Sequence, residues 1–296
     1  MQRLKSFAKG AAGRLLTTFL PLTQRKRFAL SLQRSNLPGR AALTFALLSD
    51  LARIDPDAFH RFLWSHHLAY AESYEPREMF GIENLHPLRR ELLELLTANL
   101  RAQNVVPEMD VASVLDVGCS LGYLLRHIET DVFPSAQTLV GLDVDSYAVR
   151  VGTQHLKAIG SRVELITADM SALDSALGDR TFDVVMCCGA LLYLAEETAA
   201  SAVQRMLSHA RYFVAMNDLA CGEIDNASLD ASRIRASDHG FIHNLDDMVR
   251  RAGGQVVARR WGGREVVGGN SVYLLVAQPG AAVRQSNGPA AKGEHQ

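Results

Sequence analysis

The sequence lacks the features that mark several special classes of protein. Its four cysteines form no Cys-x-x-Cys pair and have no histidine beside them at metal-ligand spacing, so we expect reduced, buried thiols. No stretch reaches the ~20 apolar residues that a membrane-spanning helix needs. The apolar segment 15–22 contains threonines and a proline and is followed by Arg25-Lys26-Arg27, unlike a secretory signal. These absences favour a cytoplasmic globular protein.

The net charge of −1 hides an uneven distribution. Nine of the 31 basic residues lie within residues 1–49, which contain no acid: Arg3, Lys5, Lys9, Arg14, Arg25, Lys26, Arg27, Arg34 and Arg40. The rest of the chain therefore has 22 basic residues against all 32 acids. Apolar residues in the basic end recur near helical spacing and predict an amphipathic helix: Leu4, Phe7, Ala8, Ala11, Leu15, Phe19 and Leu20.

This basic helix has three alternative roles. It can lie peripherally on an anionic membrane, contact a partner or cover the active site, or pack as a solvated helix on the main domain. Gly10 and Gly13 favour packing, because glycine weakens an isolated helix.

Four apolar runs, taken in order along the chain, end at an acid or a glycine. The first run, 113–117, contains Asp116 and leads into the turn Gly118-Cys119-Ser120-Leu121-Gly122 and then a helix near Leu121. The other three are 138–143, which ends in Asp143, 163–170, which contains Asp169, and 182–194, which passes from strand to helix at Gly189. A glycine turn of this kind is either a ligand cradle or only a tight turn. The repeated strand ends favour a ligand site, with Asp143 placed for a ribose diol.

This set of motifs resembles the class I (Rossmann-like) S-adenosylmethionine-dependent methyltransferases over roughly residues 110–279. The resemblance implies S-adenosyl-L-methionine as cofactor. It places the methionine part of the cofactor at Asp116, Gly118, Ser120 and Gly122, the ribose at Asp143, and the adenine at Asp169 and Met170. Val144 and Gly189 are also expected to bind the cofactor. Ser120 departs from the family, which more often has glycine there. A Gly-x-Gly-x-x-Gly fingerprint is absent, which argues against a nicotinamide enzyme.

The order of elements predicts an α/β fold with a seven-stranded, mostly parallel, doubly wound sheet and a helical N-terminal extension. Residues 1–108 form the extension, with helices over 41–53, 56–73 and 87–102, and Asp55 caps the second of these. Residues 109–279 form the cofactor-binding domain, with later strands over 212–216, 255–260 and 271–277 and a helix over 245–252. The last two strands, joined by Gly262-Gly263 and Gly268-Gly269, resemble the family's antiparallel seventh strand. The polar segment 280–296 should be disordered.

Methyl transfer is an in-line displacement, so the acceptor site should lie above the carboxyl ends of the strands. Candidate residues there are Tyr193, Asn217, Asp218, Asp238, His239 and His243. His239 is either a general base or a surface-loop histidine. Tyr193 lies either beside the transferring methyl group or under a lid. The long connection 217–243 is expected to form part of the substrate cover.

A second aromatic group spans residues 62–74, where His67, Tyr70 and Tyr74 would share one face of a helix. Enzymes that the chain resembles often close the cofactor site with an N-terminal helix. The resemblance therefore implies that Tyr70 contacts the cofactor and that Tyr74 belongs with Tyr193 and His239 to the catalytic set. The alternative is a stripe of core residues.

The acceptor is expected to be a small molecule. Nucleic acid is disfavoured because the core is acidic and no Asn-Pro-Pro-Tyr type motif follows the fourth run. Two alternatives remain. The same fold can act as a lyase or cyclase that forms azetidine-2-carboxylate from the cofactor and releases methylthioadenosine. It can also serve as a non-catalytic cofactor-binding subunit of a partner, which the presence of Asp116, Asp143 and Asp169 disfavours.

Overall fold

The computed structural model describes residues 20–33, 40–69, 80–81 and 85–280. Tyr70, Tyr74, the expected amphipathic helix up to residue 19 and the expected tail after Gly280 lie outside the described residues.

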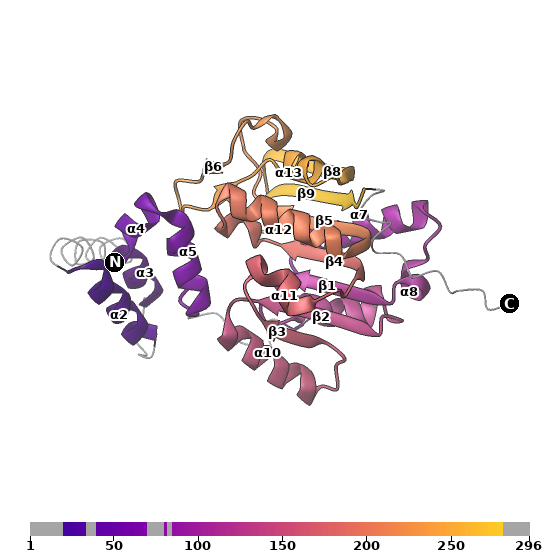
Figure 1. The fold of residues 1–296 in the computed structure, drawn as a ribbon, viewed down its shortest axis with the longest axis horizontal. Helices are drawn as coiled ribbons and strands as arrows, with labels where there is room; N and C mark the ends of the chain where they lie inside the picture. The colour runs from indigo at the N-terminus through magenta and orange to yellow at the C-terminus, as the bar shows by residue number, and fades with distance from the viewer. Residues whose placement is uncertain (1–19, 34–39, 70–79, 82–84, 281–296) are drawn as a thin grey trace.

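A seven-stranded sheet forms the centre of the molecule, with strand order β3-β2-β1-β4-β5-β9-β8 (Figure 1). Its strands are β1 Ser113–Val117, β2 Thr138–Asp143, β3 Glu164–Thr167, β4 Phe182–Cys188, β5 Ala210–Asp218, β8 Gln255–Val267 and β9 Asn270–Gln278. Strands β1 to β5 pair in parallel, and β9 runs antiparallel to both β5 and β8. The mostly parallel sheet and the antiparallel last strand are both confirmed.

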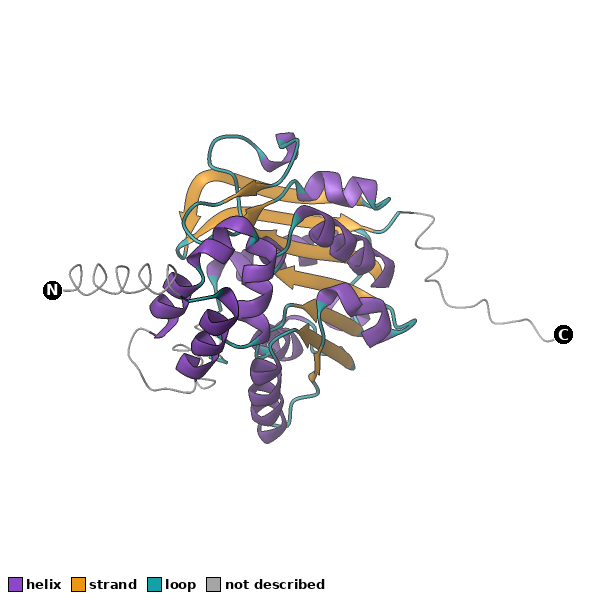
Figure 2. Cartoon of the chain, turned by 60° about the vertical axis from the view of Figure 1, so that its left-hand side comes forward, coloured by secondary structure: helices purple, strands orange, loops and turns teal. Residues whose placement is uncertain are grey.

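Helices cover both faces of this sheet (Figure 2). One face packs against α11 Leu173–Leu177, α12 Glu196–His209 and α13 Leu245–Arg251, and the other against α7 Pro87–Ala102, α9 Tyr123–His127 and α10 Ser146–Ala158. The fully buried β4 serves both layers, because alternate side chains point to opposite faces. Cys187 lies in the first core and Cys188 in the second, as predicted. All four cysteines are free and buried.

Short elements complete the domain. They are α8 Pro107–Asp110, the π-helical turn η2 Ile128–Val132, the 3-10 turns η3 Met170–Ala172, η4 Leu191–Tyr193 and η5 Asn226–Ser228, and a small sheet of β6 Arg233–Ile234 and β7 Phe241–Ile242. Two local predictions were wrong. The helix after the glycine turn begins at Tyr123, because Gly122 caps it in a left-handed conformation. Gly262 and Gly263 lie within β8, so Gly268-Gly269 alone makes the turn to β9.

In the part of the chain that the structure describes, four helices before α7 stand beyond one end of the sheet in Figure 1: α2 Leu22–Gln33, α3 Arg40–Leu47, α4 Ser49–Ile54 and α5 Pro56–Ser65. They share a hydrophobic core of their own. The buried guanidinium of Arg25 donates to both carboxylate oxygens of Asp50, at 2.5 and 2.7 Å, and to the carbonyl of Leu47. Asp50, the first acidic residue of the chain, thus neutralises Arg25, one of the nine basic residues within residues 1–49.

The single helix expected over residues 41–53 is wrong, because the chain breaks at Leu48 between α3 and α4. The break turns both Leu47 and Leu48 into the core, where each is fully buried. A continuous helix would separate these two neighbours by about 100° around its axis.

The helix expected over residues 56–73 ends at Ser65, although Asp55 caps its start as predicted by accepting from the N–H of Ala58. The side chains of Ser65 and His66 contact carbonyls of the last turn. His67 then takes a left-handed φ of 54°. His67 therefore does not continue helix α5.

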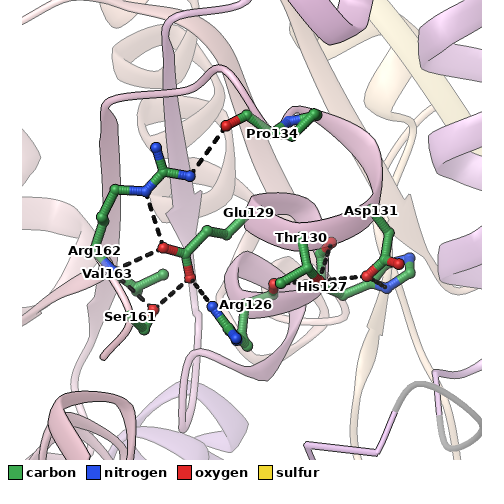
Figure 3. Close-up of polar contacts among 9 residues, drawn as sticks. All are labelled: Arg126, His127, Glu129, Thr130, Asp131, Pro134, Ser161, Arg162 and Val163. Carbon is green, nitrogen blue, oxygen red and sulfur yellow. Dashed lines mark hydrogen bonds and ion pairs between the residues drawn. The ribbon is translucent and has the colours of Figure 1, made fainter. Parts of the chain in front are cut away.

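A cluster around Glu129 fixes η2 to the start of β3, away from the sheet's carboxyl edge (Figure 3). The Glu129 carboxylate is almost fully buried and accepts from Arg126, Ser161 and Arg162, including the backbone N–H of Arg162 at 2.7 Å. These donors outweigh burial and lower the pKa of Glu129 to about 2.

No helix in the described part of the chain has the length and apolar character needed to cross a bilayer.

Candidate active site

The turn after β1 lies close to two neighbouring segments, and its glycines have different tasks. Gly118 has φ 81°, and a Cβ there would lie 2.5 Å from the Cβ of Ala190. Its N–H donates to the carbonyl of Leu142 at 2.7 Å, which ties the turn to β2. Gly122, at φ 80°, faces Leu165 and Leu156 instead. Gly118 therefore lies on the side of the turn that faces the cavity, and Gly122 lies on the side that packs against the core.

Ser120 also has a left-handed backbone, with φ 54°, which is uncommon for a residue with a side chain. Its N–H donates to Oδ2 of Asp143 at 2.7 Å, and this bond holds the turn in place. Gly152 was not expected to matter. A Cβ on Gly152 would lie 2.3 Å from the carbonyl oxygen of Leu121, so glycine is what lets α10 pack directly against the turn.

A cavity of about 250 Å³ opens above the carboxyl ends of β1, β2 and β4. Eight of the residues expected at the site line it: Gly118, Ser120, Asp143, Val144, Asp169, Met170, Gly189 and Tyr193. Asp116 and Gly122 lie behind the lining, and the side chain of His239 lies outside it. Five further polar or aromatic residues line it: His60, Arg61, Trp64, Arg89 and Tyr123. Of these, only Trp64, in the aromatic group 62–74, was expected near the site.

Asp143 stands at the tip of β2 with both carboxylate oxygens in use. Oδ2 accepts from Ser120, and Oδ1 accepts from the N–H of Asp145 at 2.8 Å. Burial raises the pKa of Asp143 to about 6 despite these bonds. Each carboxylate oxygen can accept a second hydrogen bond, so the group can still receive two hydroxyl donors from the cavity.

Asp116 lies one layer deeper and is 2% exposed. Its Oδ1 has no hydrogen-bond partner among the described residues. Burial raises the pKa of Asp116 to about 7, the charge of Arg89 lowers it, and the charge of Asp143 raises it. A buried carboxylate with an unpaired oxygen behind a glycine turn is a costly arrangement that folding alone does not require.

Arg89 extends from the first turn of α7 to the cavity, where its guanidinium lies 4.7 Å from the centre of the Tyr123 ring. Among the described residues it forms no ion pair. The sequence could have marked Arg89 as a functional candidate, because a cation in the first turn of a helix is unfavourable next to the positive end of the helix dipole.

Tyr193 lines the far side of the cavity and packs against α5. Its ring centre lies 4.7 Å from that of Trp64 and 5.0 Å from that of His60. His60 and Trp64 are four residues apart and so share a helix face, which is a signal that the sequence did offer. The His60 Nε2 lies 3.0 Å from the carbonyl of His239, and burial lowers the pKa of His60. His239 thus contacts this group through its backbone.

Two more contacts attach α5 and its end to the sheet domain. The carboxylate of Asp57 accepts from the N–H of Ala195 at 3.1 Å. His67 Nδ1 lies 2.5 Å from Oδ2 of Asp145, and both side chains are buried. Asp145 also caps α10 by accepting from Tyr147 and Ala148.

A second cavity of about 340 Å³ adjoins the first at the ends of β4 and β5 and is lined by the expected Asn217 and Asp218. The other candidates from the long connection have structural contacts. Asp238 forms an ion pair with Arg235, which lowers the pKa of Asp238. His243 is buried between Ser232 and the carbonyl of Leu191. In the described residues no group of three or more His, Cys, Asp or Glu side chains can hold a metal ion.

The comparisons with known proteins agree with this geometry. A family model described as a methyltransferase domain matches residues 114–212. The resemblance to the class I (Rossmann-like) S-adenosylmethionine-dependent methyltransferases that was inferred from the sequence is confirmed. No curated protein matches the sequence.

Solved structures are similar to this chain at low sequence identity. Magnesium protoporphyrin IX methyltransferase from Synechocystis PCC 6803, with bound S-adenosylhomocysteine, is 16% identical over 75% of this chain and 99% of its own, with a TM-score of 0.50. The 1,6-didemethyltoxoflavin-N1-methyltransferase of Burkholderia thailandensis is 16% identical over 67% and 81%, with a TM-score of 0.49. An S-adenosylmethionine-dependent methyltransferase from Clostridium acetobutylicum ATCC 824 is 10% identical over 65% and 92%, with a TM-score of 0.48.

Proposed function

We propose that this protein transfers the methyl group of S-adenosylmethionine to a small-molecule acceptor. The observation that carries the proposal is the cavity in which the glycine turn, Asp143 and Asp169 converge at the carboxyl ends of the parallel strands. S-adenosylmethionine is the cofactor of this family, and it supplies an electrophilic methyl group on a positively charged sulfur.

The residues present fit this cofactor. Gly118 lets the turn lie directly against Ala190, and both residues line the cavity. Asp143 can accept the two ribose hydroxyls, and Asp169 and Met170 line the cavity beyond it for the adenine. At the other end, Arg89 lines the cavity and the buried Asp116 lies behind its wall, and their opposite charges suit the carboxylate and amino groups of the methionine part.

The second cavity favours methyl transfer over the lyase alternative, since a reaction within the cofactor alone needs no room for an acceptor. The two cavities share Tyr193 and Gly189, so an acceptor can approach the cofactor at their junction. The protein's part in the reaction is to align the acceptor with the methyl carbon and to exclude water.

Mass spectrometry of cofactor turnover tests the proposal. With a pool of small-molecule acceptors, S-adenosylhomocysteine should form, and without acceptor no methylthioadenosine should appear. Methylthioadenosine in the absence of acceptor would identify a lyase. Tight cofactor binding without turnover under any acceptor would instead support a non-catalytic subunit.

We further propose that residues 1 to about 85 close the cavity. His60, Arg61 and Trp64 of α5 already form one wall, and His67 and Asp57 attach that wall to the sheet domain. Binding of S-adenosylhomocysteine should therefore slow amide exchange in the described helix α5, since ligand binding that orders a segment reduces its opening. Removal of residues 1–85 should abolish turnover and leave a folded sheet. A truncated protein with full activity would contradict this role.

A further inference from the structure

The second cavity, which we call the acceptor chamber, is continuous with the cofactor cavity. The two share five lining residues: Arg89, Tyr123, Cys188, Gly189 and Tyr193. The chamber extends from this junction past the end of β5 to the start of β9, where Asn270 and Ser271 line it. Its volume of about 340 Å³ suits a small molecule.

Asp218 is the most unusual residue of the acceptor chamber. It is 4% exposed, and its Oδ1 accepts from the N–H of the next residue, Leu219, at 2.8 Å. Its Oδ2 has no hydrogen-bond partner among the described residues. Buried polar atoms without partners are rare in folded proteins, and each one costs stability. Because Asp218 also lines the chamber, a ligand there can supply the missing donor.

The nearby cation Arg235 does not form an ion pair with Asp218. Arg235 lines the same chamber, but its guanidinium is engaged by Asp238, with Nε–Oδ1 and Nη2–Oδ2 distances of 2.8 and 2.5 Å. Burial raises the pKa of Asp218 to about 7, although the N–H groups of Leu219 and Leu192 and the charge of Arg235 lower it. A carboxyl group with such a pKa can take up a proton near neutral pH.

We propose that the acceptor presents an O–H or N–H group to Oδ2 of Asp218, and that Asp218 is the general base of the reaction. This inference rests on the proposed function. The lone pair of the acceptor's oxygen or nitrogen forms a bond to the methyl carbon while the carbon–sulfur bond breaks. The electrons of that bond stay on the sulfur, which becomes a neutral thioether, and the acceptor's proton passes to Oδ2. Asn217 has a side-chain amide with no hydrogen bond to a described residue and can hold a second polar group of the acceptor.

Phenol and anisole form a matched pair of probes, because anisole is the methyl ether of phenol and lacks its O–H donor. The protein is first saturated with S-adenosylhomocysteine at pH 8, where the Asp218 carboxyl is ionised. Titration of each probe, followed by ligand-observed NMR, should show phenol binding about tenfold more tightly than anisole, the effect of one hydrogen bond to a carboxylate. In Asp218→Asn an amide N–H replaces the accepting oxygen, so the preference should fall to about twofold or reverse.

Asp183→Asn is the control. Asp183 is also a buried aspartate, but it lies at the amino end of β4, where it accepts from the N–H groups of Ala112 and Ser113. This variant should lose stability and keep the preference for phenol. Equal binding of the two probes, no binding of either, or the same preference in Asp218→Asn would overturn the inference. Failure of S-adenosylhomocysteine to bind would instead overturn the proposed function, so the two failures are distinguishable.

Discussion

Replacement of Asp143 by alanine tests the central contact of the proposed cofactor site. The carboxylate is held by the N–H groups of Ser120 and Asp145 and has further acceptor capacity toward the cavity. Loss of its hydrogen bonds to the ribose should weaken cofactor binding by roughly 1–3 kcal/mol, which corresponds to about 5- to 150-fold in Kd. Calorimetry with S-adenosylhomocysteine at pH 7.5 measures this directly.

The pH dependence gives a second, independent readout. Burial raises the pKa of Asp143 to about 6, so the carboxylate is ionised at pH 7.5 and mostly protonated at pH 5. Affinity in the unmodified protein should therefore fall about tenfold over this range, since each pH unit below the pKa reduces the ionised fraction about tenfold. The affinity of Asp143→Ala should not show this fall of about tenfold between pH 7.5 and pH 5. Asp179→Ala, which removes an exposed carboxylate in the turn before β4, should bind normally. Unchanged affinity in Asp143→Ala, with an unchanged pH profile, would refute the assignment.

Two further predictions concern stability. Glu129→Gln should lower the free energy of unfolding by about 3 kcal/mol at pH 7, because the folded-state pKa of about 2 lies below the ordinary 4.5. Urea unfolding should show this difference above pH 4.5 and its loss as the pH falls toward 2, and equal stability at pH 7 would contradict the network in Figure 3. Asp116→Asn should raise the melting temperature at pH 8, because the raised pKa of about 7 means that ionisation of this buried group destabilises the fold as the pH rises from 3.8 through 7. The gain should vanish near pH 4, and a variant that melts lower at pH 8 would show that the carboxylate is a stabilising group.

The strands, the glycine turn and the acids at the strand ends could be predicted because their signals are local. A β-branched apolar run with an acid and a glycine at its end predicts where a parallel strand ends. It therefore also predicts that the acid lies at the carboxyl edge of the sheet. The helix ends were harder, since tertiary contacts decide them. The break at Leu48 depends on burial of two adjacent leucines, and the end of α5 precedes a histidine drawn to Asp145.

The walls of the cavities were the least predictable part. Arg89, Trp64 and Asp218 come from three separate regions of the chain and meet only in the folded protein. Asp218 was a candidate from its place at the end of a strand, but nothing in the sequence distinguishes its unpaired oxygen from that of an ordinary surface acid. Tyr70 and Tyr74 remain predictions.

The contacts from His67 through Asp145 to Asp143 connect the attachment of α5 with the binding of the product. The Asp145 side chain binds His67, and its backbone N–H binds the carboxylate proposed to hold the ribose. If binding of the product to Asp143 stabilises the contact between α5 and the sheet domain, then that contact increases the affinity for the product. The two effects have the same free energy. Loss of the contact between His67 and Asp145 should therefore weaken binding of the spent cofactor as well as the attachment of α5.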